Sequence, residues 1–145
     1  DIIIKKTKYW KTETLISNEF EKFDSFYDDV LISITCSGTA SLEIAKRNIP
    51  QIIIYKLNFI TEIVLKLFIK VKYACILNIV SNKMIIPEIV NSNLTNSKLI
   101  NAFKKILNNE QEQNTQIKNI NYYLASIESS QSPYDISVKR ILSLI

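Results

Sequence analysis

The sequence is poor in several residue types that carry chemistry or allow unusual backbone shapes. Its 145 residues include one glycine, two cysteines and no histidine. Without histidine there is nothing to complete a mixed Cys and His zinc site, or a Ser-His or Cys-His catalytic pair. The cysteines, Cys36 and Cys75, lack a CxxC spacing and are expected to be free thiols in a reducing compartment. The composition therefore argues against triad hydrolases and predicts no metal cofactor.

The sequence also predicts neither a membrane span nor a signal peptide. The sequence has no apolar stretch of about 20 residues that is free of lysine, which argues against a transmembrane helix. The apolar stretch at the start is too short for a signal peptide, and the first residue is not Met, so we expect a piece of a longer protein. The net charge of +4 is compatible with a nucleotide, a nucleic acid or lipid head groups, and is too small to choose among them.

The single glycine, Gly38, marks the most informative segment of the chain. It follows an apolar, β-branched run that predicts a strand over 30–36, and it precedes a helical pattern over 39–48. A second apolar run predicts another strand over 51–56. The N-terminus of a helix has free N–H groups and a partial positive charge, and a residue without Cβ lets an anion approach them. Gly38 is therefore a candidate phosphate-binding position.

The turn and the first helical residues supply groups that suit a nucleotide. The residues are Ser37, Gly38, Thr39, Ser41 and Glu43. The hydroxyls of Thr39 and Ser41 and the N–H groups of the turn suit a diphosphate, and the Glu43 carboxylate suits two adjacent ribose hydroxyls. The alternative is an ordinary N-cap at Ser37 or Thr39 followed by a glutamate that the helix dipole favours. The pattern alone leaves both interpretations open.

The rest of the chain alternates short strands with helices. In the first half we expect strands over 1–5 and 13–17, a helix from Asn18 and a helix over 59–71. An extended stretch or short strand over 71–77 and a turn into a short helix over 84–88 should follow. The C-terminal part should hold a helix capped by Thr95 or Asn96 and ended by 108–109, a Gln/Asn-rich helix through Ile127, and a last helix opened by Ser132 and Pro133. Nearly all-apolar strands between helices predict an α/β fold, with a parallel sheet flanked by helices on both faces. We expect a lobe over 1–109 and a C-terminal helical extension over 110–145 that packs on it.

The expected helix over 59–71 has an apolar stripe and an outer face on which lysines stand among aliphatic residues. That outer face, with one lysine just beyond the helix, comprises Leu65, Lys66, Ile69, Lys70 and Lys72. Such a face suits a membrane surface, whereas the alternative is a core helix with solvated lysines.

Two polar residues further along are weaker signals. Asn78 ends an apolar stretch, where its amide would suit a sugar hydroxyl or a phosphate, although asparagine there is more often a turn residue. Glu88 follows Pro87 and suits the start of a helix.

Taken in order, these segments resemble the C-terminal half of the lipid-A-disaccharide synthase family. The resemblance runs from about Phe26 to Asn108 and is carried by residues 37–43, 54–56, 58–70, 71–73, 77–79 and 86–88. It implies a glycosyltransferase type-B fold, in which two Rossmann-like lobes enclose the active cleft. This chain would supply most of the C-terminal lobe, which binds UDP.

The resemblance also implies an activity and its partners. The family transfers diacylglucosamine from UDP-2,3-diacylglucosamine to 2,3-diacylglucosamine 1-phosphate, which forms the β-1,6-linked lipid A disaccharide and releases UDP. The implied location is the cytoplasmic face of the bacterial inner membrane, with the membrane surface as a partner, no metal cofactor and no nucleic acid.

Residue by residue, the resemblance places the diphosphate at Ser37, Gly38 and Thr39 and the ribose at Glu43. Asn78 falls on an asparagine that matters for function in the family, so it is the catalytic candidate. The family's Gly-Ser-Arg loop and its N-terminal lobe, with an acidic candidate base, have no counterpart here. The chain alone is therefore expected to be inactive.

Two other interpretations stay open. One is a non-catalytic module, either the remnant of a split gene or a membrane-surface domain that uses Lys66, Lys70 and Lys72. The other is the donor lobe of a different UDP-sugar transferase, such as the one acting on the peptidoglycan lipid precursor. Flanking DNA would distinguish them, because an in-frame N-terminal lobe upstream supports the enzyme and a stop codon supports the remnant.

Overall fold

The computed structural model describes residues 2–16, 26–58, 72–128 and 132–144. It divides into two units, residues 1–30 and Leu31–Ile145, and each is described by itself. The expected helix over 59–71 and most of the helix expected from Asn18 lie outside the described residues.

The first unit corrects the prediction for the start of the chain. Residues Ile2–Thr7 form helix α1, where a strand over 1–5 was predicted, and residues 13–16 form no strand. A strand needs a neighbour for its backbone groups, whereas a helix pairs them internally. The Thr7 hydroxyl adds a bond of 3.0 Å to the Ile3 carbonyl, and Lys5 and Lys6 lie in the last turn, where the helix dipole favours cations.

The second unit contains a three-stranded parallel sheet in the order β1-β2-β3. Its elements are β1 (Ser33–Thr35), α2 (Thr39–Lys46), β2 (Gln51–Tyr55), α4 (Ile76–Ser81), β3 (Glu88–Val90), the 3-10 turn η3 (Asn91–Asn93), α5 (Asn96–Leu107), α6 (Glu110–Ile127) and α7 (Pro133–Leu142). The α/β class, with a parallel sheet flanked by helices, confirms the predicted Rossmann-like fold class. No helix within these described ranges is long and apolar enough to cross a membrane.

Strand β3 was not predicted, because the sequence suggested a turn into a helix over 84–88. Instead Glu88–Val90 pairs with β2, with Glu88 in register with Ile53. The Ile53 N–H donates to the Pro87 carbonyl over 2.9 Å, so the strand begins just after a proline that has no N–H to offer the ladder. The stretch over 71–77 also differs from its prediction, since α4 already begins at Ile76.

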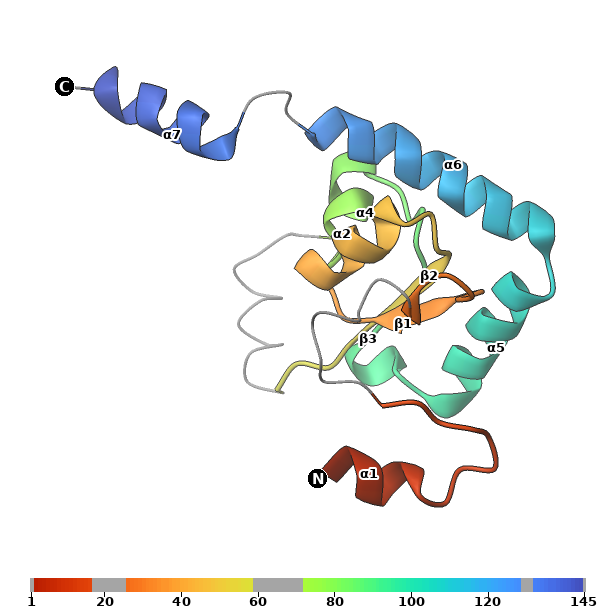
Figure 1. Ribbon diagram of the computed structural model, residues 1–145. Coiled ribbons are helices and arrows are strands. Elements are labelled where there is room, and N and C mark those ends of the chain that lie inside the picture. The colour runs from red at the N-terminus through yellow and green to blue at the C-terminus, as the bar shows by residue number, and fades with distance from the viewer. Residues whose placement is uncertain (1, 17–25, 59–71, 129–131, 145) are drawn as a thin grey trace. The chain divides into compact units, whose positions relative to one another are not determined.

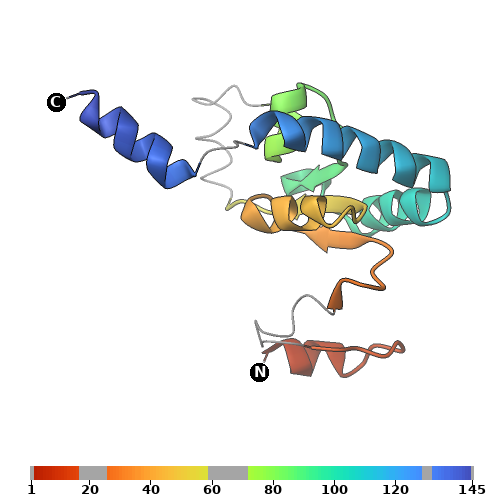
Figure 2. The same cartoon turned by 45° about the horizontal axis from the view of Figure 1, so that its top comes forward.

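Both faces of the sheet are covered, as predicted. Neighbouring residues of β2 point to opposite faces: Ile53 packs in one core cluster and Ile52 in the other. The first cluster joins the sheet to α2, α4 and α6 through Ala45, Ile53, Cys75, Leu77, Ile86, Ile120 and Leu124. The second joins it to α5 through Ile52, Ile89 and Ile106. Figures 1 and 2 show α5 and α6 beside the three-stranded sheet.

Helices α5 and α7 begin where the sequence predicted, whereas the start of α6 was not predicted. Thr95 caps α5 by accepting the Lys98 N–H over 3.3 Å, and Asn109 caps α6 by accepting the Glu112 N–H over 3.2 Å. Helix α6 packs on α2, α4 and α5. The division into a lobe over 1–109 and an extension over 110–145 stays a prediction.

Candidate functional site

The turn around Gly38 joins the carboxyl end of β1 to the first turn of α2. Ligands of open parallel α/β sheets bind outside the carboxyl ends of the strands, so this is the expected edge of the sheet. Gly38 has φ 124° and ψ −153°, a conformation that is essentially restricted to glycine. A Cβ at this position would meet nothing within 4 Å. The backbone shape alone, and no crowding by described neighbours, requires glycine here.

Asparagine serves the other positive-φ positions. Among the described residues, Asn48, Asn82 and Asn91 have φ values of 57°, 50° and 53°. Asparagine tolerates this left-handed region better than most residues. The chain therefore uses asparagine where that region suffices and keeps glycine where asparagine would be strained.

Thr39 and Glu43 are both exposed on α2 and lie four residues apart, so they share one face of the helix. Within the described part of the chain, the Glu43 carboxylate makes no hydrogen bond or ion pair. An N-terminal helix turn with an exposed hydroxyl, followed by a free acceptor, can bind an anion and a diol together.

The two serines of the predicted site face inward. Ser41 is fully buried, and its hydroxyl and its N–H both donate to the Gly38 carbonyl, over 2.7 and 3.1 Å. The Ser37 hydroxyl donates to the Ala74 carbonyl over 2.6 Å. Both hydroxyl protons therefore stabilise the turn in this structure, and their predicted contacts with a diphosphate stay a prediction.

The sequence suggested that Asn78 follows the end of a strand, but the residue lies inside helix α4. It is fully buried, and every hydrogen-bonding position of its amide is used. Its Nδ2 donates to the Ile86 carbonyl and to Glu88 Oε1, each over 2.7 Å, and its Oδ1 accepts the N–H groups of Ile85 and Ile86, each over 2.9 Å. No amide group is left for a substrate in this structure, and the predicted catalytic role is untested.

Glu88 is the residue that the sequence analysis undervalued. Its carboxylate accepts the N–H groups of Ala74 and Cys75, over 2.8 and 2.9 Å, besides the Asn78 amide. These donors come from a segment 10 to 14 residues earlier in the chain. A local sequence pattern holds no signal for such a contact.

The loops that follow β2 and β3 meet at the same edge of the sheet as the Gly38 turn. The Leu57 N–H donates to Asn91 Oδ1 over 3.0 Å.

Of the predicted membrane-surface residues, Leu65, Lys66, Ile69 and Lys70 lie outside the described residues. Lys72 is exposed, and its Nζ lies 5.2 Å from the centre of the Tyr73 ring.

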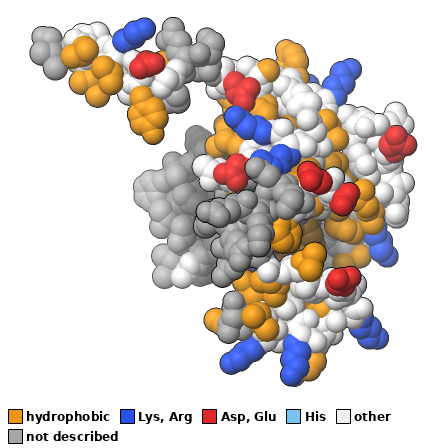
Figure 3. Space-filling view, in the orientation of Figure 1, with side chains coloured by type: hydrophobic (Ala, Val, Ile, Leu, Met, Phe, Trp, Pro, Cys, Tyr) orange, Lys and Arg blue, Asp and Glu red, His pale blue; other side chains and the backbone are white. Residues whose placement is uncertain are grey.

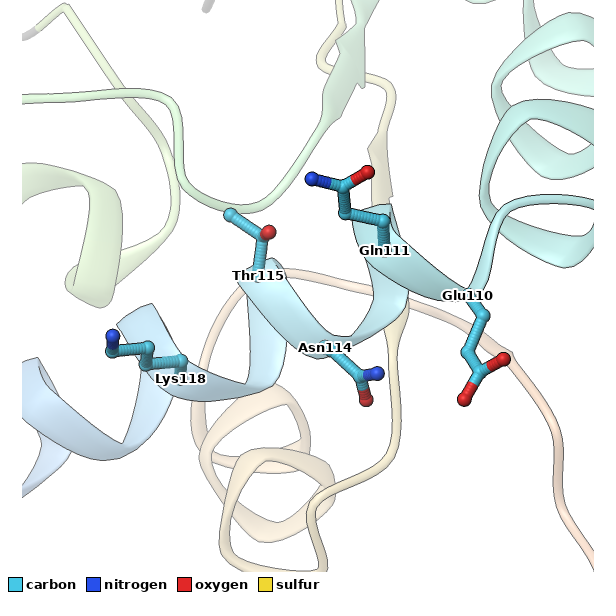
Figure 4. Close-up of a pocket in the computed structure, with 5 residues that line it drawn as sticks. All are labelled: Glu110, Gln111, Asn114, Thr115 and Lys118. Atoms are coloured by element: carbon cyan, nitrogen blue, oxygen red, sulfur yellow. The ribbon is translucent and has the colours of Figure 1, made fainter.

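A separate hollow of about 380 Å³ lies on α6. Its described lining residues are Glu110, Gln111, Asn114, Thr115 and Lys118. Figure 4 shows Gln111 and Thr115 on one side of the helix and Glu110 and Asn114 on the other, so these polar groups do not converge on one point. Acidic and basic side chains are interspersed over the face shown in Figure 3. The described residues include no group of three or more Cys, Asp or Glu placed to hold a metal ion.

Comparison with known proteins identifies one family. The family model described as lipid-A-disaccharide synthetase matches residues 1–142. The chain is 34% identical, over 128 residues, to lipid-A-disaccharide synthase of Rickettsia prowazekii (strain Madrid E). The matched region covers 87% of this chain and 33% of that protein. It is 33% identical, over 121 residues, to lipid-A-disaccharide synthase 1 of Legionella pneumophila (strain Lens), which covers 83% of this chain and 31% of that protein.

The same name recurs for lipid-A-disaccharide synthase of Rickettsia bellii (strain OSU 85-389), 38% identical over 86 residues, or 59% of this chain and 23% of that protein. The matches therefore span a third or less of the length of these curated relatives. No solved structure matches the chain. Because the family model covers almost all of its length, the chain belongs to the lipid-A-disaccharide synthetase family.

Proposed function

We propose that this chain is the UDP-binding donor lobe of a lipid-A-disaccharide synthase. The observation that carries the proposal is the Gly38 turn: a glycine-only backbone conformation at the carboxyl edge of a parallel sheet, opening a helix that exposes Thr39 and Glu43 on one face. In this proposal the diphosphate lies against the N–H groups at the start of α2, and the Glu43 carboxylate accepts the two ribose hydroxyls.

The proposed reaction is an inverting displacement at the anomeric carbon of the sugar. The acceptor hydroxyl attacks, the bond to UDP breaks, and negative charge develops on the departing diphosphate. The N-terminus of α2 would stabilise that charge, since its N–H groups are already oriented before the reaction. We assign the base to an N-terminal lobe, so that the chain acts within a complete two-lobe enzyme.

The substrates follow from the family and remain part of the proposal. They are UDP-2,3-diacylglucosamine as donor and 2,3-diacylglucosamine 1-phosphate as acceptor. Because both carry acyl chains, we also propose that the protein works as a peripheral protein at the cytoplasmic face of the inner membrane.

Calorimetric titration of the purified chain with UDP and with uridine tests the donor site. We expect UDP to bind more tightly than uridine, because only UDP places a diphosphate on the turn. Gly38→Ala should remove most of that difference, since alanine cannot hold the backbone shape of the turn. Asn82→Ala is the matched control, because it also places alanine at a positive φ but away from the turn. Equal affinities for UDP and uridine, or a folded chain that binds neither, would contradict the proposal.

A second measurement tests the two-lobe requirement. The purified chain, given both acylated substrates, should form no disaccharide. Measurable turnover by the chain alone would overturn that part of the proposal.

A further inference from the structure

Ala74 links the Gly38 turn to strand β3, because both of its backbone polar groups are hydrogen-bonded. Its carbonyl accepts the Ser37 hydroxyl over 2.6 Å, and its N–H donates to Glu88 Oε2 over 2.8 Å. Ser37 and Ala74 are 37 residues apart in the sequence. The position of the turn is therefore linked to a carboxylate on a different element.

Glu88 is itself held firmly. It begins β3 in register with Ile53, a fully buried residue of the central strand. Its Oε1 accepts the Cys75 N–H over 2.9 Å and the Asn78 amide over 2.7 Å. Asn78 cannot rotate away without breaking its bonds to Ile85 and Ile86. Hydrogen bonds to an ionised acceptor are stronger and shorter than neutral ones, so this carboxylate is a rigid anchor.

We propose that Glu88 is a positioning residue for the donor-binding turn, acting through Ala74 and Ser37, with Asn78 orienting its carboxylate. The proposal rests on the proposed function for its consequence, which is that the N–H groups of the turn are held ready for the diphosphate before it binds. Glu88 need not touch the ligand. It acts on the ligand only through the turn.

The single glycine of the chain offers a direct readout. Cell-free synthesis with 15N-glycine gives one amide signal, that of Gly38, which reports on the turn without any ligand. In Glu88→Gln an amide group replaces one carboxylate oxygen, so two donors face each other and at least one bond is lost. We expect this variant to displace or broaden the Gly38 signal, as Ser37→Ala should, and to bind UDP about tenfold more weakly.

Two control variants separate positioning from general effects. Glu110→Gln removes the same charge from an exposed residue, and Ile106→Val weakens the core on the opposite face of the sheet. Both should leave the Gly38 signal in place, although Ile106→Val lowers the midpoint of thermal unfolding. The double variant Ser37→Ala with Glu88→Gln should displace the signal little further than either single change, because both act on one chain of bonds.

If Glu88→Gln does not fold, the link is tested from its other end. Ser37→Ala should displace the Ala74 amide signal of a chain labelled with 15N-alanine, with Ala125 as the reference. An unchanged Gly38 signal in folded Glu88→Gln, or an unchanged Ala74 signal in Ser37→Ala, overturns the proposal. If the parent chain binds no UDP while Glu88→Gln displaces the Gly38 signal, the proposed function fails and the positioning link holds.

Discussion

The side chain of Gln116 pairs with the backbone of Gln51 as a neighbouring strand would. Gln116 Oε1 accepts the Gln51 N–H over 2.7 Å, and Gln116 Nε2 donates to the Gln51 carbonyl over 3.1 Å. Both residues are buried. The Gln51 side chain in turn donates to the Ser41 carbonyl over 3.0 Å, so α6, the start of β2 and α2 form one bonded unit.

Gln116→Ala should therefore destabilise the chain strongly. It leaves the buried N–H and carbonyl of Gln51 without partners, and each such group costs about 1–3 kcal/mol. We expect the free energy of unfolding, measured by urea titration, to fall by about 2–4 kcal/mol. Gln111→Ala, on the exposed side of the same helix, should change it by less than about 0.5 kcal/mol. Equal effects of the two substitutions would mean that the Gln116 bonds do not stabilise the fold.

The sequence predicted those elements whose cause is local. The apolar run of β2, the helix that follows Gly38, and the cap at Thr95 were all confirmed, because periodicity and capping residues determine them. The failures share another cause. Ile2–Ile4 has strand propensity and forms helix, whereas Glu88–Val90 forms a strand because β2 offers it a ladder. Pairing partners distant in sequence override local preference.

The candidate site divides in the same way. The sequence was sufficient to locate the Gly38 turn and to place Thr39 and Glu43 on one helical face. The inward bonds of Ser37 and Asn78 depend on residues 7 to 37 positions away, so no pattern near either residue could reveal them. The bonds of Glu88 are equally hidden from the sequence. Its N–H donors belong to Ala74 and Cys75, whereas the neighbouring Pro87 suggested only the start of a helix.

Glu43→Ala should weaken UDP binding by the purified chain. The proposed bonds from the ribose hydroxyls to an ionised acceptor are worth about 1.5–3 kcal/mol, so the dissociation constant should rise at least tenfold in calorimetry. Glu110→Ala is the control, since it removes the same charge from an exposed residue of α6. Equal UDP affinity of the parent and Glu43→Ala would remove Glu43 from the site.

The lysines at 66, 70 and 72 should carry the membrane affinity of the chain. Each lysine near an anionic surface is worth on the order of 1 kcal/mol, so changing all three to glutamate should abolish co-sedimentation with anionic vesicles. Binding by the parent should fall as salt rises, because salt screens the attraction. UDP binding should be unaffected.

A matched variant controls for net charge in that experiment. Lys104, Lys118 and Lys139 are exposed, and changing them to glutamate alters the charge by the same amount. This second triple variant should keep most of its vesicle binding. Sedimentation of the first variant at the parental level would identify its lysines as merely solvated.

The stability of the chain should fall at alkaline pH through Cys75. Burial raises the pKa of this thiol above its ordinary value of 9.0, and the nearby Glu88 carboxylate adds to the rise, against opposing hydrogen bonds from the backbone of Asn78 and Leu77 and from Ser41. The unfolded chain thus releases the proton from about pH 9.0 while the folded chain retains it. The contribution of the Cys75 thiol to the free energy of unfolding is complete below that pH and is lost above it, at up to about 1.4 kcal/mol per pH unit.

Urea titrations between pH 8 and 10, with reductant present, measure this loss in a Cys36→Ala background. The free energy of unfolding should fall more steeply with pH when Cys75 is present than in Cys75→Ser. Parallel pH profiles would show that Cys75 ionises alike in the folded and unfolded chains.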